Sequence, residues 1–286
     1  MIKGIVTALI TFLLFFSQTL FADNYPDTFY EIADVSFDIS EAVVESDEYN
    51  GEVQNPRVVY DGNLLQEGVD YEIEWADGLG QCKNAGSYKL TLIGKGIYAN
   101  SVKTEYKIFS KKITPQVILE NDTYVYSGGK ILPEVEAVKD GENVLDNNSY
   151  KIISAPANYF GFYTVEVKLV GNYSGTGSAT FKVVPRSVKS IKVKGKKKRK
   201  LEVTWKNHKA KNKKARVTGF VVELSKQKDF SSDTQKCATK GYKKTKKIVA
   251  KLKKKTRYYV HVRTYKKVGD DFLYSAWSKV KSAITK

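Results

Sequence analysis

The sequence predicts an all-β protein built from several β-sandwich domains. Apolar and polar residues alternate along many short segments, for example residues 163–169 and 201–205, in which Tyr, Val, Leu or Trp stands at every second position. A period of two places one set of side chains against a core and the other in solvent. Turns recur about every eight to twelve residues and helical periodicity is absent, which is typical of packed antiparallel sheets.

Residues 1–22 have the layout of a secretory signal peptide. Lys3 places a positive charge near the N-terminus, residues 5–16 are mostly apolar, and Ala22 ends a short cleavage motif. A membrane anchor is the alternative interpretation, but a span needs about 20 apolar residues. We therefore expect a secreted, extracellular protein with no transmembrane segment after signal cleavage.

The following region contains an internal repeat with a period of about 75 residues. The matching motifs, in order, are Tyr49-Asn50-Gly51 with Tyr126-Ser127-Gly128, Asp61-Gly62 with Asp140-Gly141, residues 85–88 with 160–163, residues 96–98 with 171–173, and residues 106–108 with 181–183. The Asp-Gly pairs indicate hairpin turns, because Gly tolerates the positive φ that tight turns need. The repeat predicts two copies of one β domain, at residues 33–109 and 110–184.

The order of these motifs resembles bacterial Ig-like modules, which occur in surface proteins of Gram-positive bacteria. The resemblance covers residues 33–184. Residues 67–71 match the family pattern in the first copy, whereas residues 146–149 depart from it in the second. It implies an Ig-like sandwich for each copy and a role as a spacer, stalk or adhesive unit without a catalytic motif.

Residues 187–286 form the third predicted domain. Its distinctive positions are Trp205, then Leu252, Thr256 and Tyr258, and finally Ser275-Ala276-Trp277-Ser278. This pattern resembles a fibronectin type III domain, in which these positions correspond to the core Trp, the lead-in to a tyrosine corner and an element near the last strand. Lys254 and Lys255 replace the usual Pro-Gly. The predicted fold is therefore three tandem β-sandwich domains, two Ig-like and one fibronectin type III-like, after a signal peptide.

The charge of the chain changes sharply between residues 184 and 185. Residues 185–286 carry 34 Lys and Arg against 6 Asp and Glu, whereas residues 1–184 carry 14 basic and 25 acidic residues. Such asymmetry points to a polyanionic partner or surface. Lys predominates over Arg, which favours diffuse attraction over base-specific contacts, so a nucleic-acid partner is not expected.

The basic residues of the third domain occur in runs. Each charge acts over about 8 Å at physiological salt, so only clustered charges act together. The alternative is that these lysines maintain solubility and protect sheet edges. The candidate residues for binding an anionic polymer are Lys196, Lys197, Lys198, Arg199, Lys200, Lys243, Lys244, Lys253, Lys254, Lys255, Tyr259 and Arg263.

Catalytic and metal-binding motifs are not found in the sequence. His208 and His261 are the only histidines, and neither has Cys, Asp or Glu at zinc-ligand spacing, so both are expected to be surface residues. Cys82 and Cys237 lie far apart and are expected to be buried or incidental, without a disulfide. We expect neither enzymatic activity nor a cofactor.

Together these observations predict a non-catalytic, cell-surface-associated adhesion or scaffold protein. Its basic domain would bind an anionic cell-wall polymer or polysaccharide, or another surface protein. One alternative is a secreted structural spacer without an anionic ligand. Another is an accessory carbohydrate-binding protein that uses aromatic stacking, whose binding would depend little on salt.

Overall fold

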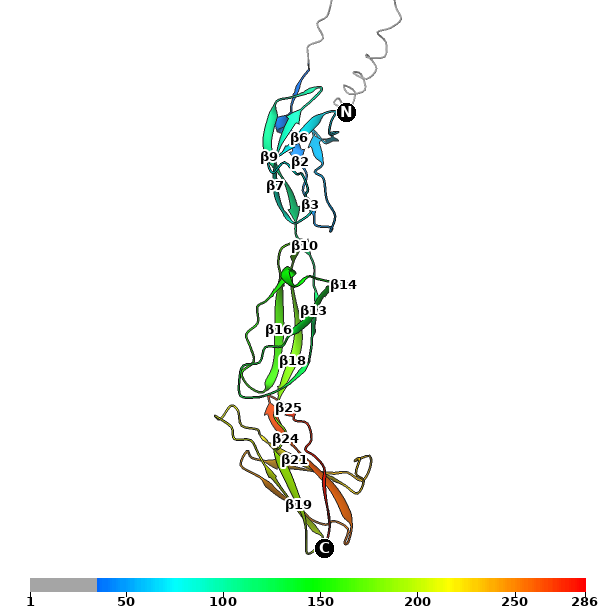
Figure 1. Cartoon of the computed structure of the whole chain (residues 1–286), viewed down its shortest axis with the longest axis vertical. Coiled ribbons are helices and arrows are strands. Elements are labelled where there is room, and N and C mark those ends of the chain that lie inside the picture. Colours follow the sequence, from blue (N-terminus) through cyan, green and yellow to red (C-terminus); the bar gives the residue numbers. More distant parts are fainter. Residues whose placement is uncertain (1–34) are drawn as a thin grey trace, which may run out of the picture.

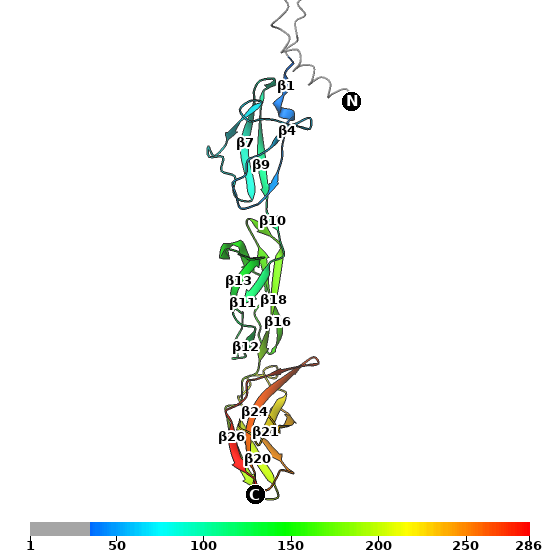
Figure 2. The ribbon, with the colours of Figure 1, turned by 90° about the vertical axis from the view of Figure 1, so that its right-hand side faces the viewer.

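The computed structural model describes residues 35–286, which form three β-sandwich units arranged end to end in an elongated molecule (Figure 1). The predicted signal peptide lies outside the described residues. A second view shows that strand β1 (Phe37–Asp38) and the C-terminus lie at opposite ends (Figure 2). The predicted all-β sandwich fold is confirmed.

The first unit contains a four-stranded sheet of order β3-β9-β7-β6, a three-stranded sheet of order β2-β4-β5, and a short parallel pair of β1 with β8. After β1, its elements are the 3₁₀ turn η1 (Ile39–Glu41), β2 (Val43–Val44), β3 (Asp47–Glu48), β4 (Val58–Tyr60), β5 (Asn63–Leu64), β6 (Tyr71–Trp75), β7 (Gly86–Gly94), β8 (Tyr98–Ala99) and β9 (Ser101–Phe109).

The second unit repeats this topology strand for strand. Its sheets have the orders β12-β18-β16-β15 and β11-β13-β14, and β10 pairs in parallel with β17. Its elements are β10 (Lys111–Lys112), β11 (Gln116–Leu119), β12 (Thr123–Val125), β13 (Val135–Asp140), β14 (Asn143–Val144), the 3₁₀ turn η2 (Asn147–Ser149), β15 (Tyr150–Ile152), β16 (Gly161–Leu169), β17 (Tyr173–Ser174) and β18 (Thr176–Val184). The two copies predicted from the sequence therefore share one architecture.

The repeated residues explain the shared topology. Asp61 and Gly62, both at positive φ, turn β4 into β5, and Gly141, also at positive φ, lies in the matching turn between β13 and β14. Tyr106 is fully buried in the core of the first unit, and Phe181 is buried at the matching position of the second. The repeat thus conserves the turn chemistry and the core side chains that a sandwich needs.

The third unit packs a three-stranded sheet of order β19-β20-β23 against a five-stranded sheet, in which four strands have the order β22-β21-β24-β25 and β26 also pairs with β24. Trp205, 4% exposed, packs on Phe220 in the core between the sheets. The strands are β19 (Ser190–Lys196), β20 (Lys200–Lys206), β21 (Gly219–Ser225), β22 (Gln235–Lys240), β23 (Lys246–Val249), β24 (Arg257–Val268), β25 (Asp271–Tyr274) and β26 (Lys281–Ile284).

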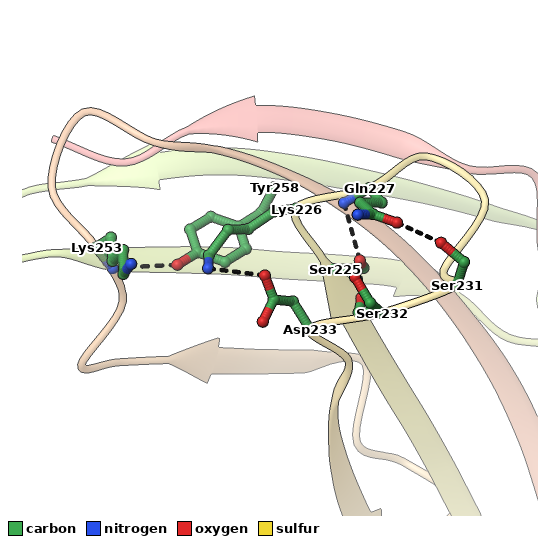
Figure 3. A network of polar contacts seen from close by, with 8 residues as sticks. All are labelled: Ser225, Lys226, Gln227, Ser231, Ser232, Asp233, Lys253 and Tyr258. Atoms are coloured by element: carbon green, nitrogen blue, oxygen red, sulfur yellow. Dashed lines mark hydrogen bonds and ion pairs between the residues drawn. The ribbon is translucent and has the colours of Figure 1, made fainter.

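Two local features of the third unit involve residues that carry its resemblance to a fibronectin type III domain. The Tyr258 hydroxyl accepts a hydrogen bond of 3.1 Å from the backbone N–H of Lys253, which forms the expected tyrosine corner (Figure 3). Between β25 and β26, the Ser275 and Ser278 hydroxyls accept hydrogen bonds from backbone N–H groups of β24 at 3.0 and 3.1 Å. In the gap between β25 and β26, these serine hydroxyls therefore accept hydrogen bonds from β24 that a neighbouring strand would otherwise accept.

Side chains of neighbouring units contact each other at both joints. At the first joint, the Asn172 side chain contacts Asn84 and the backbone N–H of Ala85 at 2.9 and 2.8 Å. At the second joint, Phe160 and Val184 pack on Leu273 in a small apolar core. The described strands fall within the predicted ranges 33–109, 110–184 and 187–286, and the domain boundaries themselves stay a prediction.

Candidate anion-binding surface

The structure brings two of the predicted basic runs together at the end of the molecule that carries the C-terminus (Figure 1). Residues 196–200 form the hairpin between β19 and β20, and residues 251–255 form the connection between β23 and β24. The backbone N–H of Leu252 donates to the Arg199 carbonyl at 3.2 Å, and the Arg199 N–H donates to the Lys286 carbonyl at 3.0 Å. We call residues 196–200, 251–255 and 286 the basic tip.

Several residues of the basic tip adopt a backbone conformation that favours glycine. The φ values are 61° at Lys198, 53° at Arg199, 61° at Lys251 and 49° at Lys255. A left-handed conformation costs a residue with a Cβ atom roughly 1–2 kcal/mol, which glycine avoids. The tip therefore keeps four basic side chains at positions where their backbone conformation is unfavourable.

Electrostatic repulsion adds to this strain. Lys196 lies directly opposite Lys200 in the antiparallel pair of β19 and β20. Like charges in direct cross-strand pairs are destabilising. The Glu202 carboxylate lies 3.5 Å from the Lys196 ammonium and 2.7 Å from that of Lys246, and the hydrogen bond from Lys246, helped by Lys196, lowers the pKa of Glu202. One carboxylate thus relieves part of the repulsion among the lysines around it.

A basic face, which the sequence reasoning missed, continues from the tip along the outer side of the three-stranded sheet. Inward-facing Leu201, Val203 and Trp205 are buried, so the alternate residues of these strands point outward. The outward basic residues are Lys192, Lys194, Lys196, Lys200, Lys206 and Lys246. Next-but-one residues of a strand lie about 6.7 Å apart, within the range of their charges. Lysine at every second position from 192 to 196 is the signal that could have revealed this face.

The remaining predicted lysines, Lys243 and Lys244, lie at the other end of the unit. They follow Tyr242 in the turn between β22 and β23, where the Asn207 amide donates to the Tyr242 carbonyl at 3.3 Å. Tyr242 and Asn207 line a hollow together with residues of the second unit. The structure therefore does not bring Lys243 and Lys244 to the basic tip.

Arg263 and Tyr259 lie on the outer side of the five-stranded sheet of the third unit. The Arg263 guanidinium is stacked between the rings of Tyr274 and Trp277, at 3.9 and 4.3 Å from the ring centroids. Tyr259 is partly buried and pairs with Ser225 across the sheet. Arg263 is thus engaged in intramolecular cation–π contacts, and neither residue belongs to the basic tip.

The expectation that both histidines are surface residues is wrong. His261 is 8% exposed and stacks between Phe230 and Trp277, with ring centroids 3.8 Å away on each side. Its Nε2 lies 2.8 Å from a carboxylate oxygen of buried Glu223. Burial lowers the pKa of His261, although Glu223 opposes this effect. The alternation of β24 places His261 on the outer side of the sheet, but the sequence could not show that Trp277 covers it.

The described residues contain no cluster of three His, Cys, Asp or Glu side chains that could hold a metal ion. Between residues 35 and 286, no helix is long and apolar enough to cross a membrane. Both cysteines are free thiols, and burial raises the pKa of Cys82 to about 11, which makes it a poor nucleophile at neutral pH.

The net charge rises steeply along the molecule. Residues 35–109 carry 13 acidic and 6 basic side chains, and residues 110–184 carry 8 acidic and 7 basic side chains. Residues 185–286 carry 34 basic and 6 acidic side chains, so all of the net positive charge lies in the third unit. Because the units follow one another along the long axis, the acidic and strongly basic regions lie at opposite ends (Figure 2).

No protein-family model and no curated protein matches the chain. Similar solved structures include domains of titin, with 16% identity over 83% of this chain and 98% of that chain at a TM-score of 0.30. The FN1–FN3 domains of chicken CNTN1 share 13% identity over 86% and 98% of the two chains, at a TM-score of 0.31. The third fibronectin III domain of the human KIAA0343 protein shares 15% sequence identity, with 34% of this chain and 78% of that chain covered, at a TM-score of 0.27. Scores this low carry no argument, so the fold assignment rests on the strand topology and the tyrosine corner.

Proposed function

We propose that the protein is a non-catalytic, extracellular adhesion or scaffold protein. Its basic tip and basic face hold it to an anionic polymer of the cell envelope, at the surface of a Gram-positive bacterium. The acidic first unit then projects from the surface, where it is free to contact another surface protein.

The observation that carries this proposal is the conformational strain of the basic tip. Lys198, Arg199, Lys251 and Lys255 all occupy positive φ. If lysines served only solubility, these positions would accept glycine without loss, since many other exposed lysines remain. Strained residues that persist in a fold are a reason to look for function. A role that requires the charge at the tip accounts for their presence.

The test measures sedimentation of the mature chain with isolated Gram-positive cell walls. Binding should be strong at roughly 50 mM salt and largely lost at roughly 500 mM, because salt screens attraction between exposed charges. The key variant replaces Lys198, Arg199, Lys251 and Lys255 by Gly. It removes four charges and relieves strain, so weaker binding could not be attributed to unfolding.

A matched control removes four charges away from the tip, by Lys213→Gln, Lys240→Gln, Lys243→Gln and Lys244→Gln. The proposal expects this control to keep most of the binding that the glycine variant loses. Equal loss in both variants would show that net charge alone matters. Binding that persists at high salt would favour the aromatic-stacking alternative, and absence of binding at low salt would leave only the spacer role.

A further inference from the structure

A second basic site lies at the opposite end of the third unit, next to the second unit. It is a groove whose lining contains four cationic side chains, Arg186, Lys189, Lys206 and Lys209, and no carboxylate. The backbone N–H of Lys189 donates to the Lys206 carbonyl at 2.8 Å, which holds the start of the unit beside the end of β20. Four cations without a counter-charge in one groove favour an anionic ligand.

The groove also contains a buried donor without a partner. Trp205 lines it, and the Nε1–H of its indole is buried without a hydrogen-bond partner among residues 35–286. A buried tryptophan N–H usually finds an acceptor. An oxygen atom of an anion in the groove would reach this N–H only after a local shift of the residues that cover it.

His208 lies beside two of the cationic side chains of the groove, Lys189 and Arg186. Its imidazole is half-buried, and its pKa is lowered first by burial and then by the charges of Lys189 and Arg186. A backbone hydrogen bond with Ser187 opposes this lowering. An anion bound beside it would offset the two cations and raise its pKa.

The position of Arg186 is set by the fold. Its carbonyl accepts a hydrogen bond of 2.7 Å from the hydroxyl of fully buried Thr264, and its guanidinium donates to the Ser127 carbonyl at 3.3 Å. A hollow of about 200 Å³ adjoins the groove and shares Arg186 and His208 with it. Aromatic side chains of both units, Tyr126, Phe160 and Tyr242, line this hollow.

We propose that the groove binds a phosphate group, with the adjoining hollow receiving a ring attached to that phosphate. A phosphate monoester carries nearly two negative charges at pH 7 and several acceptor oxygens, which suits a site with four cations and an orphan N–H donor. The proposal goes beyond the adhesion function, which relies on the basic tip at the other end of the unit and on the basic face. Lys206 belongs both to that face and to the groove.

The test is an NMR titration of the full mature chain with inorganic phosphate at constant ionic strength. The chain has only two histidines and three tryptophans, so each ring can be followed individually. We expect saturable shifts of the His208 ring and of the Trp205 indole N–H, with a raised pKa for His208. His261 and Trp75 lie elsewhere and should not move. Equal shifts at both histidines, or no saturation, would overturn the proposal.

A pair of charge-matched variants locates the site. Lys189→Gln with Lys209→Gln should weaken phosphate binding about tenfold. Lys192→Gln with Lys194→Gln removes the same charge from the basic face and should leave phosphate binding unchanged. Equal weakening in both pairs would contradict a discrete site.

Two further arms define the ligand and its relation to cell-wall binding. If the hollow accepts a ring, glucose 6-phosphate should bind at least as tightly as inorganic phosphate. Weaker binding of glucose 6-phosphate would refute the proposal that the hollow receives a ring. Acetate at the same concentration should shift His208 less. Wall sedimentation of the Lys189→Gln, Lys209→Gln variant distinguishes this site from the adhesion surface, since adhesion through the basic tip and basic face should persist in it.

Discussion

The strain of the basic tip predicts that glycine substitutions have opposite effects at neighbouring positions. Lys198 and Lys255 have φ values of 61° and 49°, whereas Lys197 and Lys254 do not adopt positive φ. We compare the double variant Lys198→Gly, Lys255→Gly with the double variant Lys197→Gly, Lys254→Gly. Both remove two charges from the same two turns, so their net charge is identical.

The size of the effect follows from two opposing terms. Glycine relieves about 1–2 kcal/mol of left-handed strain at Lys198 and at Lys255. It also increases the conformational entropy of the unfolded chain, at about 0.5–1 kcal/mol per site. The first variant should therefore gain roughly 1–2 kcal/mol in unfolding free energy, and the second should lose about 1–2 kcal/mol, because only the entropic term applies there.

This difference is measured by unfolding the mature chain in urea and monitoring the third unit through the hydrogen exchange of backbone amides in β20. Urea is preferable to guanidinium chloride, whose salt would screen repulsion among the lysines. If both variants shift the transition in the same direction, charge removal rather than backbone conformation controls the stability of the tip, and the strain argument fails.

Three further substitutions test individual contacts of the third unit. Tyr258→Phe removes the hydroxyl that accepts from the Lys253 N–H, and thermal unfolding should show a loss of about 1–2 kcal/mol. Thr264→Val leaves the Arg186 carbonyl without its buried donor and should lower the unfolding free energy by about 1–3 kcal/mol, measured in urea. Glu202 has a lowered pKa, so it stabilises the fold above the pKa of about 4.3 in the unfolded chain, and this contribution disappears as the pH falls through the lower folded value. In Glu202→Gln, the decrease in unfolding free energy between about pH 5 and pH 3 should therefore be smaller than in the parent chain.

The fold was largely predictable because its determinants are local. Alternating residues identified strands such as β16 and β20, and the Asp-Gly turns identified the hairpins after β4 and β13. The hydrogen bond of Tyr258 was predictable because the tyrosine corner joins residues only five positions apart. The short parallel pairs, such as β1 with β8, join segments far apart in sequence, and no local pattern indicates them.

The candidate surface was only partly predictable, because a linear run of lysines does not show which side of a sheet it occupies. Residues 196–200 were found, yet Lys192 and Lys246 were missed, since only the pairing of β19 and β23 with β20 places them on one face. His261 illustrates the opposite error. Its alternation suggested exposure, but Phe230 and Trp277 arrive from loops to cover it.

The parallel edge pairs of the first two units have a mechanical consequence. The strand near the entry of each unit lies beside its last strand: β3 pairs with β9, and β12 pairs with β18. When tension pulls the two ends of the chain apart, the strands of each pair slide against each other along their length. The hydrogen bonds between them then bear the force simultaneously rather than one after another. In a protein held at its basic end and pulled at its acidic end, the two parallel strand pairs would bear this force in series, one in each of the first two units.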